Sequence, residues 1–175
     1  MHRTLSSLRI AILALAVALP CCAQTMPEHQ HEKAPVSTHL TVTVDGKPTT
    51  LAVEDLQAMP QKTITVHNEH TKMDETYTGV LLSDLLAKYG APFDKPGEKK
   101  IFHSYLRAEG TDKYYVLYSG SEVEPTMHNA EVIVAITLNG KPLADDGQFK
   151  LVASGDKRPA RWVRNLSSIS LVAVP

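Results

Sequence analysis

The chain has 175 residues, of which 43% are hydrophobic and 21% are charged, and its formal net charge is −1 at pH 7. This length is enough for one domain with a core of useful size. A charge balance so close to neutral argues against nucleic acid or a membrane surface as the main partner.

Residues 1–23 have the pattern of a signal peptide. Arg3 and Arg9 form a positive start, and residues 10–19 are an apolar run too short to span a bilayer. Small residues around Ala23 favour cleavage after this position. We therefore predict a secreted or periplasmic mature protein, with no membrane partner after cleavage.

Cleavage after Ala23 would remove both cysteines of the chain, Cys21 and Cys22. The mature protein would then have no disulfide, no thiolate nucleophile and no thiolate ligand for a metal. Its net charge would be −3, because sixteen basic side chains remain against nineteen acidic ones. A lipoprotein with the lipid on Cys21 or Cys22 is the alternative interpretation.

Residues 24–38 are predicted to form a flexible linker, since Pro, Glu, His and Gln dominate this stretch and bulky apolar residues are scarce. The linker contains His29 and His31, flanked by Glu28 and Glu32. A His-x-His pair between carboxylates can hold a divalent metal. A solvated polar linker explains the same residues.

Residues 39–175 are predicted to form one α+β domain. A leucine stripe predicts a helix over residues 81–89, and Asp45-Gly46 predicts a hairpin turn. The predicted strands span residues 40–44, 49–53, 61–66, 76–80, 101–107, 114–118, 132–138 and 149–153, and residues 67–75 are expected to form a polar loop. We therefore expect a mixed, partly barrel-like β-sheet with short interleaved helices.

A basic cluster surrounds Trp162, the only tryptophan in the chain. It consists of Lys157, Arg158, Arg161 and Arg164. Guanidinium groups grip phosphate or carboxylate bidentately and stack on flat rings, so the pattern is typical of a site for a planar anion. A solvated, salt-bridged loop beside a core tryptophan is the alternative.

Two histidines, His67 and His70, are candidate metal ligands. A turn would let both reach one ion, with Asp74 or Glu75 as oxygen ligands. A polar, solvated loop is again the alternative. His128, beside a methionine, is a candidate for the wall of a cleft.

Two common enzyme classes find no support in the sequence. No serine lies in a Gly-x-Ser-x-Gly turn, which argues against a serine hydrolase of that type. No glycine-rich phosphate loop occurs, which argues against a P-loop nucleotide site.

A series of segments resembles, in order, the molybdopterin-binding domain of the sulfite oxidase fold. They are Val-Thr-Val-Asp-Gly at 42–46, the stretch 53–60 ending in Met-Pro, Tyr-Thr-Gly-Val-Leu-Leu-Ser-Asp-Leu-Leu at 77–86, and residues 108–114, 139–143, 147–152 and 159–166. Together they cover nearly all of residues 39–174. The resemblance implies the mixed fold expected above.

The resemblance also implies a cofactor and a site. In that family a cleft lined by basic side chains and backbone amides holds the pterin cofactor, and a cysteine thiolate binds molybdenum. The corresponding segment here, His67 to Glu75, contains no cysteine. Carried over to this chain, the resemblance places Lys157, Arg158 and Arg161 beside the anionic cofactor. It also places Trp162 in the following hydrophobic slot and His67 on the metal side.

These observations lead to three functional hypotheses. The first is an exported protein that binds a small, planar, anionic ligand of the pterin type, with molybdopterin possible and thiolate-ligated molybdenum not expected. The second is an active molybdenum-cofactor oxidoreductase with a non-cysteine ligand, such as His67, and an unidentified redox partner. The third is a periplasmic metal-binding protein that uses His29, His31, His67 and His70.

Overall fold

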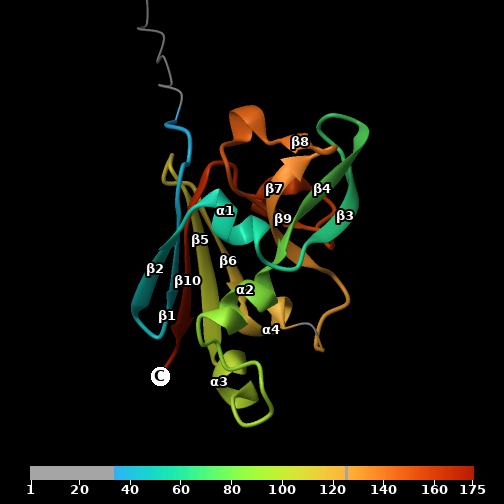
Figure 1. The fold of residues 1–175 in the computed structure, drawn as a ribbon. Coiled ribbons are helices and arrows are strands. Elements are labelled where there is room, and N and C mark those ends of the chain that lie inside the picture. Colours follow the sequence, from blue (N-terminus) through green and yellow to red (C-terminus); the bar gives the residue numbers. More distant parts are fainter. Residues whose placement is uncertain (1–33, 125) are drawn as a thin grey trace, which may run out of the picture. The chain divides into compact units, whose positions relative to one another are not determined.

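The computed structural model describes residues 34–124 and 126–175, which fold around two β-sheets (Figure 1). The predicted signal peptide and residues 24–33 of the predicted linker lie outside the described residues. In chain order the strands are β1 (Leu40–Val44), β2 (Lys47–Leu51), β3 (Lys62–Asn68), β4 (Met73–Leu81), β5 (Ser104–Gly110), β6 (Tyr115–Ser119), β7 (Val132–Leu138), β8 (Lys141–Pro142), β9 (Lys150–Ala153) and β10 (Leu166–Ala173).

The first sheet has the strand order β2-β1-β10-β5-β6. The β1–β10 pair is parallel and the other pairs are antiparallel, so this sheet is mixed. The second sheet has the order β3-β4-β7-β8, with β9 also paired to β7, and is antiparallel. The mixed α+β fold is therefore confirmed, but within the described residues the strands form two sheets and no closed barrel.

Short helices lie between the strands, as predicted. They are α1 (Val53–Gln57), α2 (Leu82–Lys88), α3 (Glu98–Phe102), α4 (Gly120–Val123) and the 3-10 turns η1 (Ala144–Asp146) and η2 (Pro159–Arg161). Helix α2 buries Leu82, Leu85 and Leu86 in the core, which is the stripe that predicted it. Among the described residues, no helix combines the length and hydropathy needed to span a bilayer.

The prediction for residues 101–107 was partly wrong. Ile101 and Phe102 end helix α3, and β5 begins only at Ser104. A short apolar run has the same appearance in a strand and in a buried helical turn, and here Ile101 is buried while Phe102 is exposed.

The polar loop predicted over residues 67–75 was also wrong. Strand β3 continues through Asn68 and β4 starts at Met73, so only residues 69–72 form the turn. The ladder pairs His67 with Asp74 and Asn68 with Met73. The burial of Ile64, Val66 and Asn68 alternates with exposed residues, so this polar stretch keeps the period of a strand.

The last residues of the predicted linker are held by the domain. Thr111 donates a hydrogen bond to the carbonyl of Pro35, and the backbone of Ser37 bonds to Gln148 and to the side chain of Asn165. Ser37 is buried. The domain therefore begins a few residues before the predicted boundary at residue 39.

We predict that Gly79→Ala destabilises the fold by about 3 kcal/mol, because an added Cβ would overlap the backbone of β7. That Cβ would lie 2.0 Å from the carbonyl oxygen of Val134 and 2.6 Å from the Cα of Ala135. Urea unfolding measures the change.

Gly46→Ala is the control, since its Cβ would meet nothing within 4 Å and only the left-handed backbone at φ +72° opposes it. We expect a cost of about 1 kcal/mol for that conformation. Equal losses for the two variants would contradict the close approach of β4 and β7.

Candidate functional site

A cavity of about 380 Å³ lies between the β3–β4 turn, the start of β9 and the segment around η2. Its lining consists of Asn68, His70, Thr71, Glu75, Tyr77, Leu138, Asp146, Lys150, Pro159, Trp162 and Arg164. Strand alternation supplies much of this wall: Glu75 and Tyr77 are two residues apart on β4 and point to the same face. The site combines charged, polar and aromatic groups in one hollow.

The carboxylate of Glu75 is the best-bonded group in the wall. It accepts hydrogen bonds from Asn68 Nδ2 at 2.9 and 3.0 Å, from Thr71 Oγ1 at 3.0 Å and from the Tyr77 hydroxyl at 2.7 Å. Only 7% of Glu75 is exposed. A buried carboxylate needs such donors to remain charged without a large energetic cost.

The pKa values follow from this environment. Burial alone would raise the pKa of Glu75, but the hydrogen bonds from Tyr77, Asn68 and Thr71 outweigh it and hold the pKa below the ordinary glutamate value. Burial, together with the hydrogen bond to Glu75, raises the pKa of Tyr77 well above its usual range. Glu75 is therefore ionised and Tyr77 neutral at physiological pH.

Lys150 continues the chain of polar contacts across the cavity floor. Its Nζ donates to the Tyr77 hydroxyl at 2.8 Å and to Asp146 Oδ2 at 2.7 Å. The ammonium also lies 4.8 Å from the ring centroid of Tyr77 and 5.7 Å from that of Trp162. Lys150 is only 6% exposed, so its charge is balanced mainly by these neighbours.

Trp162 lines the cavity. It is buried, its indole N–H donates to the carbonyl of Ala153, and its ring makes an edge contact with Tyr77 at 5.8 Å. Trp162 therefore both fills the core and forms part of the cavity wall.

The guanidinium of Arg161 is largely engaged by carboxylates of the protein. Its guanidinium bonds to Asp156 at 2.5 and 3.2 Å and to Glu122 at 2.9 Å, and it stacks on the ring of Tyr118 at 4.4 Å. The hydrogen bond with Asp156 is the main cause that raises its pKa above the ordinary arginine value. Two carboxylates of the protein thus hold most of this guanidinium, and a role of Arg161 in ligand binding stays a prediction.

The other cations of the basic cluster are exposed. Lys157 and Arg158 are on the surface and do not line the cavity. Arg158 lies within electrostatic range of Glu69, which belongs to the β3–β4 turn. Arg164 lines the cavity with 74% of its side chain exposed, and its nearest carboxylate is Asp146 at 3.9 Å.

The two histidines proposed for a metal site lie on different parts of the hairpin, His67 on β3 and His70 in the β3–β4 turn. His67 points away from the cavity and bonds to Asp74 at 2.8 Å, whereas His70 lines the cavity. In the described part of the chain, no three His, Cys, Asp or Glu side chains are arranged to hold a metal ion. His29 and His31 lie outside the described residues. His67 is therefore outside the wall of this cavity, and its predicted role at a cofactor or metal stays a prediction.

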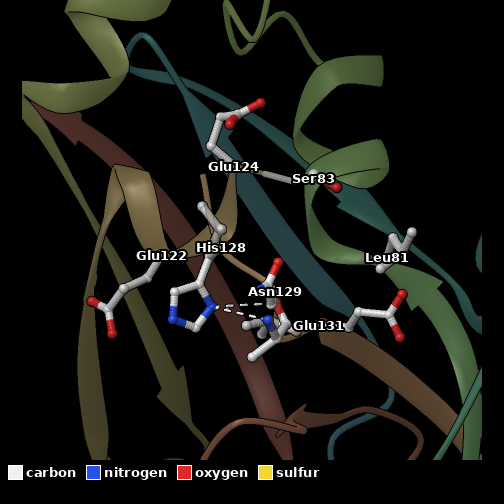
Figure 2. A pocket seen from close by; sticks show the side chains of 10 residues that line it. Leu81, Ser83, Glu122, Glu124, His128, Asn129 and Glu131 are labelled. Atoms are coloured by element: carbon white, nitrogen blue, oxygen red, sulfur yellow. Dashed lines mark hydrogen bonds between the residues drawn. The ribbon is translucent and has the colours of Figure 1, made fainter. Parts of the chain in front are cut away.

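A second cavity, of about 230 Å³, surrounds His128 (Figure 2). Its presence confirms that this histidine lines a hollow. The carboxylates of Glu122 and Glu131 lie on opposite sides of the imidazole in Figure 2. They are paired with Arg161 and Lys62, respectively. These carboxylates do not converge on one point, so the cavity at Lys150 is the stronger candidate site.

Sequence reasoning missed the residues that build the cavity floor. Glu75 was considered only as a metal ligand, and Asn68, Tyr77, Asp146 and Lys150 were not singled out. Lys150 did carry a signal, because it is a charged residue in the apolar run Phe149 to Ala153. A buried lysine usually has a specific partner or function.

We predict that Glu75→Gln lowers stability at pH 7 by about 2 to 3 kcal/mol, since hydrogen bonds to a charged group are lost or weakened. The folded-state pKa of Glu75 is lowered, so its contribution is present above the unfolded-state pKa and disappears as the pH falls through the folded-state value. Urea unfolding at pH 7 and at acidic pH should therefore show a smaller pH dependence in Glu75→Gln. An unchanged acid dependence would contradict an ionised Glu75.

Comparisons with known proteins show the fold and the family of the domain. A search of curated protein sequences found no match. The structure of the sulfane dehydrogenase SoxCD from Paracoccus pantotrophus is similar, with a TM-score of 0.58 and 21% identity. The likeness covers 82% of this chain and only 40% of that one, and at this identity it shows the fold alone. The family described as "Oxidoreductase molybdopterin binding domain" matches residues 28–173, so this chain belongs to that family.

Proposed function

We propose that this protein is exported and binds a small, planar, anionic ligand of the pterin type in the cavity beside Lys150, without thiolate-ligated molybdenum. Membership of a molybdopterin-binding family supports a pterin-type ligand. The cavity volume of about 380 Å³ lies in the usual range for small-molecule sites. The pattern of residues 1–23 supports export.

The single observation that carries the proposal is the unused hydrogen-bond donor of Lys150. An ammonium group has three N–H donors, and Lys150 uses two of them, on Tyr77 and Asp146. The third has no partner among the described residues. In a site this buried, an anionic oxygen at that N–H would make a strong charge-assisted hydrogen bond.

The formal charges of the lining are balanced, so selectivity depends on which groups remain unsatisfied. The lining contains two carboxylates, Glu75 and Asp146, together with one lysine and one arginine, Lys150 and Arg164. Glu75 already accepts four hydrogen bonds, and Asp146 accepts from Lys150. Lys150 and Arg164 retain free donors, which favours an anion over a cation.

The residues present fit the pterin better than they fit its metal. Lys150, Arg164 and His70 could bind anionic or carbonyl oxygens of the ligand, and Trp162 and Tyr77 supply aromatic surface. No sulfur atom belongs to the described lining, and residues 28–173 contain no cysteine. A thiolate bond to molybdenum therefore has no donor within the matched domain.

We predict that Arg164→Met weakens binding of pterin-6-carboxylate, a planar anionic probe, by about 10-fold or more, because a charge-assisted hydrogen bond is lost. Lys150→Met should abolish measurable binding. Isothermal titration calorimetry checks both variants, and thermal melts confirm that they fold.

Arg164 is largely exposed, so its variant tests binding even if Lys150→Met fails to fold. Lys47→Met is the matched control, since Lys47 lies on β2 in the other sheet and is exposed. The absence of any binding heat with wild type, together with no pterin in the purified protein, would contradict the proposal. Equal binding by wild type and Arg164→Met would remove Arg164 from the site.

We also predict that protein produced in a molybdenum-replete host contains no stoichiometric molybdenum, because the matched domain offers no thiolate. Elemental analysis by mass spectrometry measures the metal content per chain. One molybdenum per chain would contradict this prediction and support the oxidoreductase with a non-cysteine ligand.

A further inference from the structure

Strand β6 is an edge of the first sheet and differs from the other edges. The edge strands β2, β3 and β8 each carry a lysine: Lys47, Lys62 and Lys141. Proline is also present in β2 and β8. Lysine and proline on an edge oppose pairing with another strand. Strand β6, Tyr-Val-Leu-Tyr-Ser, has neither.

The backbone edge of β6 is free. Outside its ladder with β5, the backbone of residues 115–118 makes no hydrogen bond to any described residue. The groups that face away from β5 therefore have no protein partner within the part of the chain that the structure describes. Such a row of donors and acceptors is a template for another strand.

The side chains next to this edge are unusually apolar for a surface. On one face of β6, Tyr115 and Leu117 are 52% and 50% exposed, while Val116 and Tyr118 on the other face are buried. Arg107 of β5 lies over the ring of Tyr115 at 4.3 Å and leaves the outer edge of β6 uncovered. An apolar patch beside an unpaired strand edge is typical of an interaction surface.

We propose that β6 pairs antiparallel with β6 of a second copy of this chain, about a two-fold axis at Leu117. This register is self-complementary on the outer face. On the outer face Leu117 meets the partner's Leu117, and the large Tyr115 meets the small side chain of the partner's Ser119. On the inner face Val116 and Tyr118 are already buried within their own protomer, so the pairing rests on the backbone and the outer face.

Charge also favours a second copy. Residues 115–119 carry no charge, so two copies place no like charges opposite each other in the strand. Lys113, with 83% of its side chain exposed, precedes the strand, and helix α4 with Glu122 follows it. Antiparallel pairing brings Lys113 towards the partner's Glu122 at each end. The two first sheets then form one continuous sheet across the axis.

Analytical ultracentrifugation over a range of protein concentrations tests the association. We expect wild type to shift from monomer to dimer as the concentration rises, and Leu117→Lys to stay monomeric with an unchanged thermal melt. Met73→Lys is the control, because Met73 is 61% exposed on β4, and it should dimerise like wild type. Wild type that remains monomeric, or a Leu117→Lys variant that still dimerises, overturns the proposal.

Disulfide trapping tests the register. In chains with Cys21 and Cys22 replaced by Ala, Leu117→Cys should form a disulfide-linked dimer on mild oxidation, since the two-fold axis places this residue beside its own copy. Tyr115→Cys should not do so alone, but should do so in the double variant Tyr115→Cys, Ser119→Cys. Crosslinking of Tyr115→Cys alone with equal yield would contradict the proposed register.

Discussion

Glu75 is an ionised carboxylate enclosed by the protein, and the shape of the candidate site depends on the groups that hold it. Its four hydrogen bonds fix Asn68 and Thr71 at the β3–β4 turn and Tyr77 on β4. Tyr77 in turn accepts from Lys150, which binds Asp146. One buried charge thus sets the positions of side chains from β3, β4, η1 and β9.

The protein partners of each cation near the cavity determine whether it has hydrogen-bond donors left for a ligand. Arg161 is held between Asp156 and Glu122, so its guanidinium stabilises the contact between the η2 segment and α4. Lys150 and Arg164 are only partly used by the protein. Clustering of cations in the sequence therefore singled out Arg164 but not Lys150, whereas the donors left without a protein partner in the cavity point to both as candidates.

Local patterns made much of the fold predictable, and long-range pairing made the site hard to predict. The leucine stripe gave helix α2 within about one residue at each end, and alternation gave most strands. The alternation of buried and exposed residues in β3 continues from Ile64 and Val66 to Asn68, which places Asn68 on the buried face. Because Asn68 and its neighbours are polar, this alternation was not recognised in the sequence. The contacts of Tyr77 with Lys150 and of Glu122 with Arg161 join residues 73 and 39 positions apart, and nothing in the local sequence specifies them.

A crystal structure of the protein soaked with pterin-6-carboxylate tests the central claim most directly. The account predicts density for the ligand between Trp162 and His70, with an anionic oxygen within hydrogen-bond distance of Lys150 Nζ and the contacts of Glu75 unchanged. Ligand density in the cavity around His128, or a Lys150 that keeps its two protein contacts and never touches the ligand, would contradict it.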